Sequence, residues 1–256
     1  MSTDVLYLCK NRKGFTKFSL EKLFKNTDWA LVDHLVIYDD GSTDGTRPWL
    51  RERTNRRLVP VQVEVRETAF GSPVAVMDDF LANTTATRFA KVDNDIVMPP
   101  GWLNRLTEVM DGSPELELLG AEAGRMGIPN VEYDQLHDLP RWWTPARHIG
   151  GVGLMRTESF LRRRRLEANG RFGFTEWQHE FQPVCGWVTP DLLVCSLDQV
   201  PMLPWSRLAG EYVDLGWARE WPKYHERYPY YWGWWAGPKA WDEYNRLQAL
   251  LSGGNT

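Results

Sequence analysis

The fold of this chain is indicated most strongly by residues 35–46, which read LVIYDDGSTDGT. Four apolar or aromatic residues are followed directly by Asp39 and Asp40, and then by a turn rich in glycine. This pattern is typical of a short buried strand that ends where the chain turns. Ligands of open α/β sheets bind beyond the carboxyl ends of the strands. The two carboxylates therefore predict a ligand site at the end of this strand.

A second stretch of the same kind occupies residues 89–101 and reads FAKVDNDIVMPPG. Its apolar part ends at Asp93, and Asp95 follows two positions later. Carboxylates at the ends of two strands suit a divalent cation together with the hydroxyls and phosphates of a nucleotide. We therefore expect the two acidic stretches to lie around one bound ligand.

Strands and helices alternate through the first half of the chain. Further strands are predicted at 5–9, at 59–65, where Val59, Val61, Val63 and Val65 alternate strictly, and at 116–121. Helices are predicted at 15–24, at 46–53 with Thr46 as N-cap, at 72–82 with Ser72 as N-cap, and at 99–110. This order predicts an α/β fold with a mostly parallel sheet covered by helices.

The pattern loosens beyond residue 122. Residues 125–149 are predicted to form a long loop or lid, followed by helices at 157–168 and 176–182 and a strand at 192–197. We predict one main domain over 1–204, with a first half over 1–121 and a second half over 122–204. An aromatic-rich C-terminal extension, residues 205–256, is expected to pack on this domain.

Composition excludes several classes of protein. The net charge of −4 gives no global attraction to nucleic acid or membranes, so any such contact depends on a local patch. No apolar stretch approaches the ~18 residues of a membrane span, and none resembles a signal peptide, so we expect a cytoplasmic protein. Cys9, Cys185 and Cys195 lack metal-site spacing, and Cys9 and Cys195 are expected to be small core residues in a reducing compartment.

The two acidic stretches resemble the Asp-Asp-Gly-Ser and Asp-x-Asp motifs of GT-A-fold glycosyltransferases, specifically the inverting family 2. The resemblance runs in the same order from about residue 5 to about residue 200. It implies a Rossmann-like fold, a nucleotide-diphosphate sugar as donor, most often a UDP-sugar, and Mn²⁺ or Mg²⁺ on the diphosphate. The reaction implied is inverting transfer of the sugar to an acceptor hydroxyl. The resemblance thus implies a catalytic domain over 1–204, with a nucleotide-binding half over 1–121 and an acceptor-side half over 122–204.

The resemblance also implies roles for the aspartates. Asp95 is the leading metal ligand, and Asp93 binds the metal or the ribose hydroxyls. Asp39 accepts a hydrogen bond from the base or contacts the ribose, and Asp40 supports Asp39 or the metal. The alternative is structural, because turn and helix-cap aspartates are common.

Four further residues are assigned to the donor site by the same resemblance. Asn11 and Arg12 belong at the rim of the base pocket, and Gly71 belongs near the nucleotide. Gly151, with Gly150 before it, lets the backbone approach the donor sugar or the acceptor. Val76 and Met77 occupy the positions where the family usually has an arginine, so the base that is bound stays open.

Inverting transfer needs a carboxylate that takes the proton of the acceptor hydroxyl. Glu176 occupies the first position of the family's acidic pair, Trp177 replaces the second, and Glu180 is the reserve candidate. The structural alternative is a helix capped by Thr175, whose first turn favours acids. Asp198 follows the last predicted strand, where the family more often has a histidine as a third metal ligand.

The acceptor is left open by the sequence. Seven of the 14 Trp lie between residues 205 and 241, where they either pack on the sheet or form a platform for a sugar or a base. The arginine run 162–165 forms either a solvated helix face or a phosphate contact. The acceptor is therefore a saccharide, a small molecule, or a hydroxymethylated base in phage-type DNA.

Two other functions compete with the transferase. One is a non-catalytic module of the same fold that binds a sugar or a nucleotide, which the substitution at Trp177 keeps open. The other is a sugar-nucleotide pyrophosphorylase. Those enzymes have a glycine-rich N-terminal loop, and residues 10–14 (KNRKG) lack that glycine density, so the pyrophosphorylase is less favoured.

Overall fold

The structure is a computed structural model, and it describes residues 2–54, 59–98, 100–121, 143–150, 152–162, 174–188 and 195–196. The strands of the main sheet are β1 (Thr3–Cys9), β2 (His34–Asp40), β3 (Gln62–Thr68), β4 (Arg88–Asp93), β6 (Leu118–Gly120), β7 (Trp143–Ala146), β8 (Gly153–Arg156) and β9 (Cys185–Val188). The helices are α1 (Lys13–Asn26), α2 (Thr46–Thr54), α3 (Pro73–Asn83), α4 (Trp102–Asp111), α6 (Thr157–Arg162) and α7 (Phe174–Phe181), with a 3₁₀ turn η1 (Trp29–Leu31).

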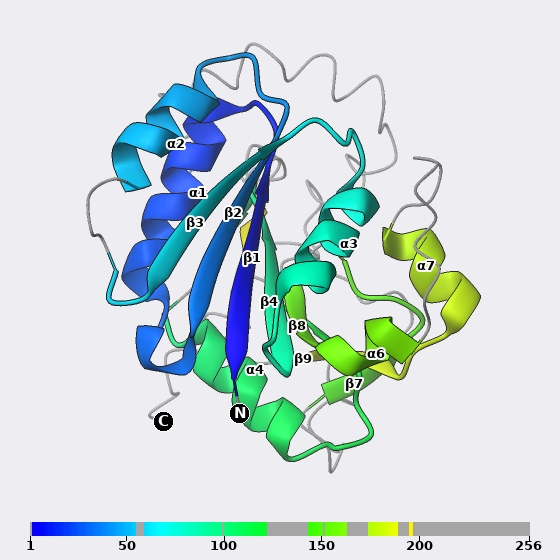
Figure 1. Ribbon diagram of the computed structural model, residues 1–256. Helices are drawn as coiled ribbons and strands as arrows, with labels where there is room; N and C mark the ends of the chain where they lie inside the picture. The colour runs from blue at the N-terminus through cyan, green and yellow to red at the C-terminus, as the bar shows by residue number, and fades with distance from the viewer. Residues whose placement is uncertain are drawn as a thin grey trace, which may run out of the picture.

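The main sheet has the order β3-β2-β1-β4-β8-β6-β9-β7 (Figure 1). Strands β3, β2, β1 and β4 are parallel neighbours, so their carboxyl ends share one edge. β8 runs antiparallel to both β4 and β6. A separate two-stranded ladder joins β5 (Ile96–Val97) to β10 (Cys195–Ser196). The predicted α/β fold is confirmed, with antiparallel strands in its second half.

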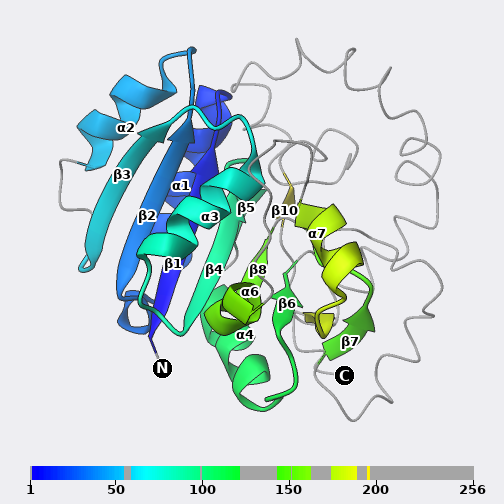
Figure 2. The same cartoon turned by 45° about the vertical axis from the view of Figure 1, so that its right-hand side comes forward.

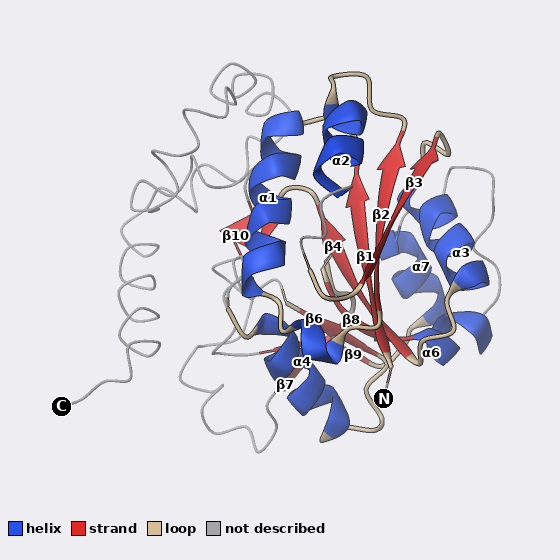
Figure 3. Ribbon diagram, turned by 60° about the vertical axis from the view of Figure 1, so that its left-hand side comes forward, coloured by secondary structure: helices blue, strands red, loops and turns tan. Residues whose placement is uncertain are grey.

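Helices cover both faces of this sheet. In Figures 1 and 3, α1 and α2 lie on one face, and α3, α6 and α7 lie on the other. Alternate residues of each strand point to opposite faces. Val5 and Tyr7 thus pack in the core under α1, α2 and α4, whereas Leu6 and Leu8 pack in the core under α3, α6 and α7. Burial of large apolar side chains, at about 1.5–3 kcal/mol each, holds the three layers together.

Most of the predicted elements of the first half are confirmed, with local corrections. The third strand begins at Gln62 rather than at Val59 and continues to Thr68. Thr46 is the first residue of α2 and not its N-cap, because the Asp44 side chain accepts hydrogen bonds from the Thr46 N–H at 3.1 Å and its hydroxyl at 2.6 Å. Ser72 is the N-cap of α3, as predicted, although its side chain makes no capping hydrogen bond.

The second half departs further from the prediction. Residues 143–146, expected in the loop, form edge strand β7, and β8 and β9 were not predicted. Three predicted features lie outside the described residues: the part of that loop from 125 to 142, the helix from 163 to 168, and the segment 205–256. Cys9 and Cys185 are buried free thiols, and the side chain of Cys195 is not described. Within the described ranges, no helix has the length and apolar character needed to span a membrane.

Candidate functional site

The two acidic stretches meet at the carboxyl edge of the sheet. On the two sides of β1, Cys9 is paired with Asp39 of β2, and Leu8 is paired with Asp93 of β4. Only one strand therefore separates the two stretches, although they are about fifty residues apart in the chain. Figure 2 shows the ends of these strands between α1 and α3. The predicted convergence of the two stretches is present in the structure.

The segment between β1 and α1 bridges the two stretches. The Asn11 N–H donates to Ser42 Oγ at 2.7 Å, and Asn11 Oδ1 accepts from the Thr43 N–H at 2.8 Å. On the other side, the Asn11 carbonyl oxygen accepts from Asn94 Nδ2 at 3.1 Å. Asn11 thus fastens the first acidic turn to the second through its own backbone and side chain.

Arg12 makes the second connection across this edge. Its Nη1 donates to Asp95 Oδ2 at 3.0 Å, and its guanidinium carbon lies 5.6 Å from the centre of the Phe15 ring. Asn11 and Arg12 both have φ of 55°, a left-handed conformation that is uncommon outside glycine. This backbone directs consecutive residues toward different acidic stretches, and local strain of this kind tends to occur at functional sites.

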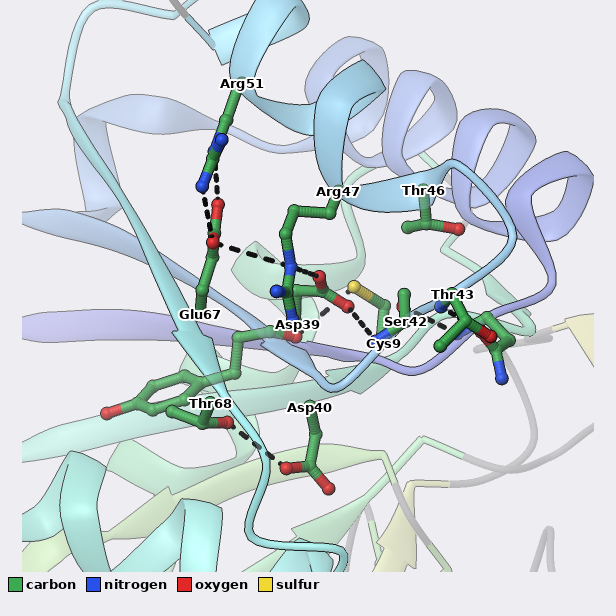
Figure 4. A network of polar contacts seen from close by, with 12 residues as sticks. Cys9, Asp39, Asp40, Ser42, Thr43, Thr46, Arg47, Arg51, Glu67 and Thr68 are labelled. Atoms are coloured by element: carbon green, nitrogen blue, oxygen red, sulfur yellow. Dashed lines mark hydrogen bonds and ion pairs between the residues drawn. The ribbon is translucent and has the colours of Figure 1, made fainter.

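Asp39 is completely buried and has two polar partners (Figure 4). Its Oδ1 accepts from the Ser42 N–H at 3.1 Å, and its Oδ2 accepts from Arg47 Nε at 2.8 Å. The hydrogen bond to Asp39 raises the pKa of Arg47, whose Nε also lies 3.4 Å from Glu67 Oε2. Both oxygens of Asp39 thus hold the turn in place, and contact with the donor stays a prediction for this residue.

Asp40 and Gly71 were assigned separately to the donor site, and the structure places them in contact. Asp40 Oδ1 accepts from Thr68 Oγ1 at 3.2 Å and from the Gly71 N–H at 3.2 Å. Gly71 has a φ of 70°, which glycine adopts without strain. The other oxygen of Asp40 lies 4.0 Å from Lys10 Nζ. This carboxylate therefore links the loops that follow β1, β2 and β3.

Asp93 forms an ion pair with Lys91, two residues earlier on the same face of β4. The Lys91 side chain is only 2% exposed, and its Nζ lies 5.9 Å from the centre of the Phe174 ring. A buried lysine requires a partner of opposite charge. Because Phe174 is the first residue of α7, the start of this helix lies beside the Asp93 ion pair.

Glu176 is exposed in the first turn of α7, and Glu180 is exposed one turn later. Trp177, between them, is buried and stacks on Phe160 of α6 with ring centres 4.3 Å apart. The buried Trp177 side chain therefore anchors the helix. Since α7 begins at Phe174, Thr175 lies within the helix and is not its N-cap.

The chain segment that leads to Gly150 is fastened to α7. The buried Gln178 side chain accepts from the Ile149 N–H at 2.7 Å and donates to the Ile149 carbonyl at 3.0 Å. A second link joins His179 Nε2 to His148 Nδ1 at 3.1 Å. Gly151 itself lies outside the described residues. The position of this segment and the position of Glu176 are thus coupled through one helix.

The carboxylates of Asp93 and Asp95 are oxygen donors of the kind that Mg²⁺ and Mn²⁺ prefer. No cluster of three or more His, Cys, Asp or Glu side chains suited to a metal is found among the described residues, and Asp198 lies outside them. Two carboxylates nevertheless fit such a cation, because Mg²⁺ is commonly held by one or two carboxylates with substrate phosphates and water as further ligands.

Several residues that shape the site were not predicted from the sequence. They are Lys91, Arg47, Asn94 and Gln178. Lys91 alone had a usable signal, because a lysine in an apolar strand, two positions before an aspartate, shares a face with it. The partners of the other three are between 8 and 83 residues away and depend on the fold.

A separate cavity of about 140 Å³ lies near the starts of β1 and β2, at the opposite end of these strands from the acidic stretches. Its lining includes Asp4, His34 and Arg66, but none of the predicted site residues. Asp4 accepts hydrogen bonds from His34 and Thr84, at 3.0 and 2.6 Å. These polar groups satisfy one another, so we assign no ligand to this cavity.

Solved glycosyltransferase structures share this fold at low sequence identity. S. aureus TarS (residues 1–349) is 12% identical with a TM-score of 0.59, and the match covers 96% of this chain and 79% of that one. The Pyrobaculum calidifontis mannosyltransferase PcManGT, in complex with GDP-Man and Mn²⁺, is 13% identical with a TM-score of 0.56. That match covers 75% of this chain and 55% of that one.

TarS 1–349 in complex with UDP-GlcNAc gives 14% identity and a TM-score of 0.56, over 76% of this chain and 58% of that one. No curated protein sequence matches the chain significantly. The profile of one protein family, Glycosyl transferase family 2, matches residues 4–161 and thus more than half of the chain. The protein therefore belongs to glycosyl transferase family 2, and it is a glycosyltransferase of the GT-A fold.

Proposed function

We propose that this protein is a metal-dependent, inverting glycosyltransferase that moves a sugar from a nucleotide-diphosphate sugar to an acceptor hydroxyl. The single observation that carries the proposal is the bridge made by Asn11 and Arg12. Asn11 contacts the turn after Asp39–Asp40, and Arg12 contacts Asp95. A ligand at this edge meets carboxylates of both stretches and the basic side chains of the loop between β1 and α1, which suits a cation bound to a diphosphate.

The cation, when bound, neutralises charge that develops on the departing diphosphate. Asp95 and Asp93 are the residues proposed to hold it. Asp40, which accepts a hydrogen bond from Gly71 and faces Lys10, is proposed to position the nucleotide together with Asn11. The buried Asp39 supports the turn on which Asp40 lies. A UDP-sugar is the proposed donor, because the similar TarS structure was solved in complex with UDP-GlcNAc, and GDP- and TDP-sugars belong in the same screen.

Glu176 is the proposed base. The acceptor oxygen attacks the anomeric carbon as its proton passes to the Glu176 carboxylate, and the bond from that carbon to the diphosphate oxygen breaks. This single in-line displacement inverts the anomeric centre. Glu176 fits because it is exposed on α7, whose first residue lies beside the Lys91–Asp93 pair. Gly151, in the segment fastened to the same helix, is proposed to approach the sugar or the acceptor.

A saccharide or a small molecule is the favoured acceptor. Arg162, the first arginine of the run 162–165, lies 3.3 Å from Glu117 and 3.8 Å from Glu158, so acidic neighbours already offset its charge. The net charge of −4 also opposes DNA. The acceptor screen also includes hydroxymethylated DNA. If the protein binds DNA, its affinity should fall steeply as the salt concentration rises.

The decisive experiment compares Asp95→Ala with the parent protein in a hydrolysis and transfer screen with Mn²⁺. The substitution removes the leading metal ligand, a half-buried side chain, so we expect turnover to fall by about 10²-fold or more, the order of loss when one group that stabilises the transition state is removed. We expect the circular dichroism spectrum to be unchanged. Glu108→Ala, on the exposed face of α4, is the matched control. Full activity of Asp95→Ala would refute the metal assignment.

A further inference from the structure

The acidic residues of the site are of two kinds, according to the basic residues that face them. Asp39 and Asp93 are paired with Arg47 and the buried Lys91, which belong to α2 and β4. Asp40 and Asp95 face Lys10 and Arg12, which belong to the loop between β1 and α1. One short loop thus supplies a positive charge to each of the two acidic stretches.

The basic residues of this loop can leave their partners, whereas Lys91 cannot do so readily. The Arg12 side chain is 35% exposed and that of Lys10 is 52% exposed, against 2% for Lys91. Partly exposed ion pairs are weak, so a competing cation displaces them at small cost. Withdrawal of a buried lysine would leave an unpaired buried charge, which is far more costly.

A cation bound to Asp95 must compete with Arg12, because Arg12 Nη1 already lies 3.0 Å from Asp95 Oδ2. The left-handed backbone and the hydrogen bonds of Asn11 fix the base of the Arg12 side chain at this edge. A displaced guanidinium therefore remains near the site, where a diphosphate bound to the cation offers it new partners. Guanidinium groups bind phosphate oxygens in a two-pronged geometry.

We propose that Arg12 exchanges partners during donor binding: it neutralises Asp95 in the free protein and moves to the donor diphosphate when the divalent cation binds Asp95. This inference rests on the proposed function, since it takes Asp95 as a metal ligand. It makes Arg12 a residue that selects for the complete cation–diphosphate over the cation alone. Without diphosphate, the metal ion must compete with Arg12 for the Asp95 carboxylate. When the diphosphate is bound, Arg12 pairs with it instead and no longer competes.

The exchange gives Arg12→Ala effects of opposite sign on two binding constants. Without nucleotide, Mn²⁺ should bind about two- to fivefold more tightly, the range expected when a partly exposed ion pair no longer competes. With saturating Mn²⁺, UDP or GDP should bind about tenfold or more weakly, because a charge-assisted hydrogen bond to the diphosphate is lost. A purely structural role for Arg12 would weaken both.

The test is a Mn²⁺ titration followed by electron paramagnetic resonance, together with calorimetry of UDP and GDP in the presence of Mn²⁺. Arg12→Lys keeps the charge and should leave Mn²⁺ affinity near that of the parent protein. Arg105→Ala removes an arginine from α4 and serves as the matched control. Unchanged or weaker Mn²⁺ binding by Arg12→Ala overturns the inference.

Asp95→Ala, titrated in parallel, separates failure of this inference from failure of the proposed function. If Asp95→Ala binds Mn²⁺ as well as the parent protein does, the cation lies elsewhere, and both the metal assignment and the partner exchange are wrong. If Asp95→Ala loses Mn²⁺ but Arg12→Ala does not tighten its binding, only the exchange is wrong. Tighter binding by Arg12→Ala that depends on Asp95 supports both.

Discussion

Single residues at the carboxyl edge of the sheet are arranged by charge. Asp39, Asp40, Asp93 and Asp95 each have a basic residue nearby, which is Arg47, Lys10, Lys91 and Arg12, respectively. This balance lets four carboxylates gather in a small space, since like charges at such proximity would otherwise destabilise the fold. Of these basic residues, Lys10 and Arg12 are partly exposed and can reach a diphosphate, so part of the charge that stabilises the free protein also suits the proposed ligand.

Glu176→Gln tests the proposed base. Loss of the proton acceptor should lower kcat by about 10²- to 10⁴-fold, the usual contribution of general base catalysis. The donor KM should change little, because Glu176 is exposed on α7 and is not proposed to hold the nucleotide. Steady-state kinetics of transfer measure both constants. Glu180→Gln, one turn along the same helix, is the matched control, and a larger kcat loss in that variant would move the assignment to Glu180.

Asp78 on α3 gives a prediction about pH. Burial raises the pKa of Asp78 to about 6 from its usual value of 3.8. The folded protein therefore binds the Asp78 proton more tightly than the unfolded chain does. The contribution of protonated Asp78 to the free energy of unfolding is fully present below pH 3.8 and is lost as the pH rises through about 6. The Asp78→Asn side chain stays neutral at every pH, so this variant does not lose that stability as the pH rises.

We expect Asp78→Asn to be more stable than the parent protein at pH 7.5, by up to about 1 kcal/mol after allowance for solvent screening. The difference should shrink toward pH 4. Urea unfolding at the two pH values measures it. A variant that is less stable than the parent protein at pH 7.5 would show that the charged form of Asp78 has a favourable partner.

Helix α7 is the element that couples the two sides of the proposed reaction. Its first residue approaches the Lys91–Asp93 pair, its exposed face carries Glu176, and its buried face holds Trp177 and Gln178. The stacking of Trp177 on Phe160 fixes this helix to α6. Trp177 thus anchors the helix that carries Glu176.

Gln178→Leu tests this anchoring. The substitution removes the two hydrogen bonds to Ile149 and leaves the N–H and carbonyl of a buried residue without their side-chain partner. We expect the free energy of unfolding to fall by about 2–4 kcal/mol, since each unsatisfied buried group costs ~1–3 kcal/mol. Urea unfolding measures this loss. Gln182→Leu, just beyond the exposed end of the helix, is the control, and equal stability of the two variants would contradict the anchoring role.

Elements with a strong local pattern could be predicted from the sequence, and those defined by distant partners could not. Strands β1, β2 and β4 are buried apolar runs that end at polar turns, so their existence and shared edge followed from the pattern alone. β7 contains Pro145 and lies at the sheet edge next to β9, whereas β8 spans four residues between two antiparallel neighbours. Such pairings are created by the fold and leave little periodicity in the sequence.

At the scale of the molecule, the sheet brings distant parts of the chain to one edge. The parallel order β3-β2-β1-β4 places the ends of four strands together, and the loop after β1 lies between the two acidic stretches. The sequence predicted this meeting of Asp39–Asp40 with Asp93–Asp95. It could not predict that Arg12 reaches Asp95, because that contact joins residues 83 positions apart and depends on a left-handed backbone.

The central claim is that both acidic stretches surround one cation–diphosphate. The most direct measurement is anomalous diffraction from crystals grown with Mn²⁺ and UDP, or with GDP if UDP does not bind. The account predicts a single manganese peak at about 2.0–2.6 Å from a carboxylate oxygen of Asp95. The diphosphate should lie between this peak and the loop that carries Asn11 and Arg12. Manganese or nucleotide bound away from this edge, in crystals of active protein, would contradict the account.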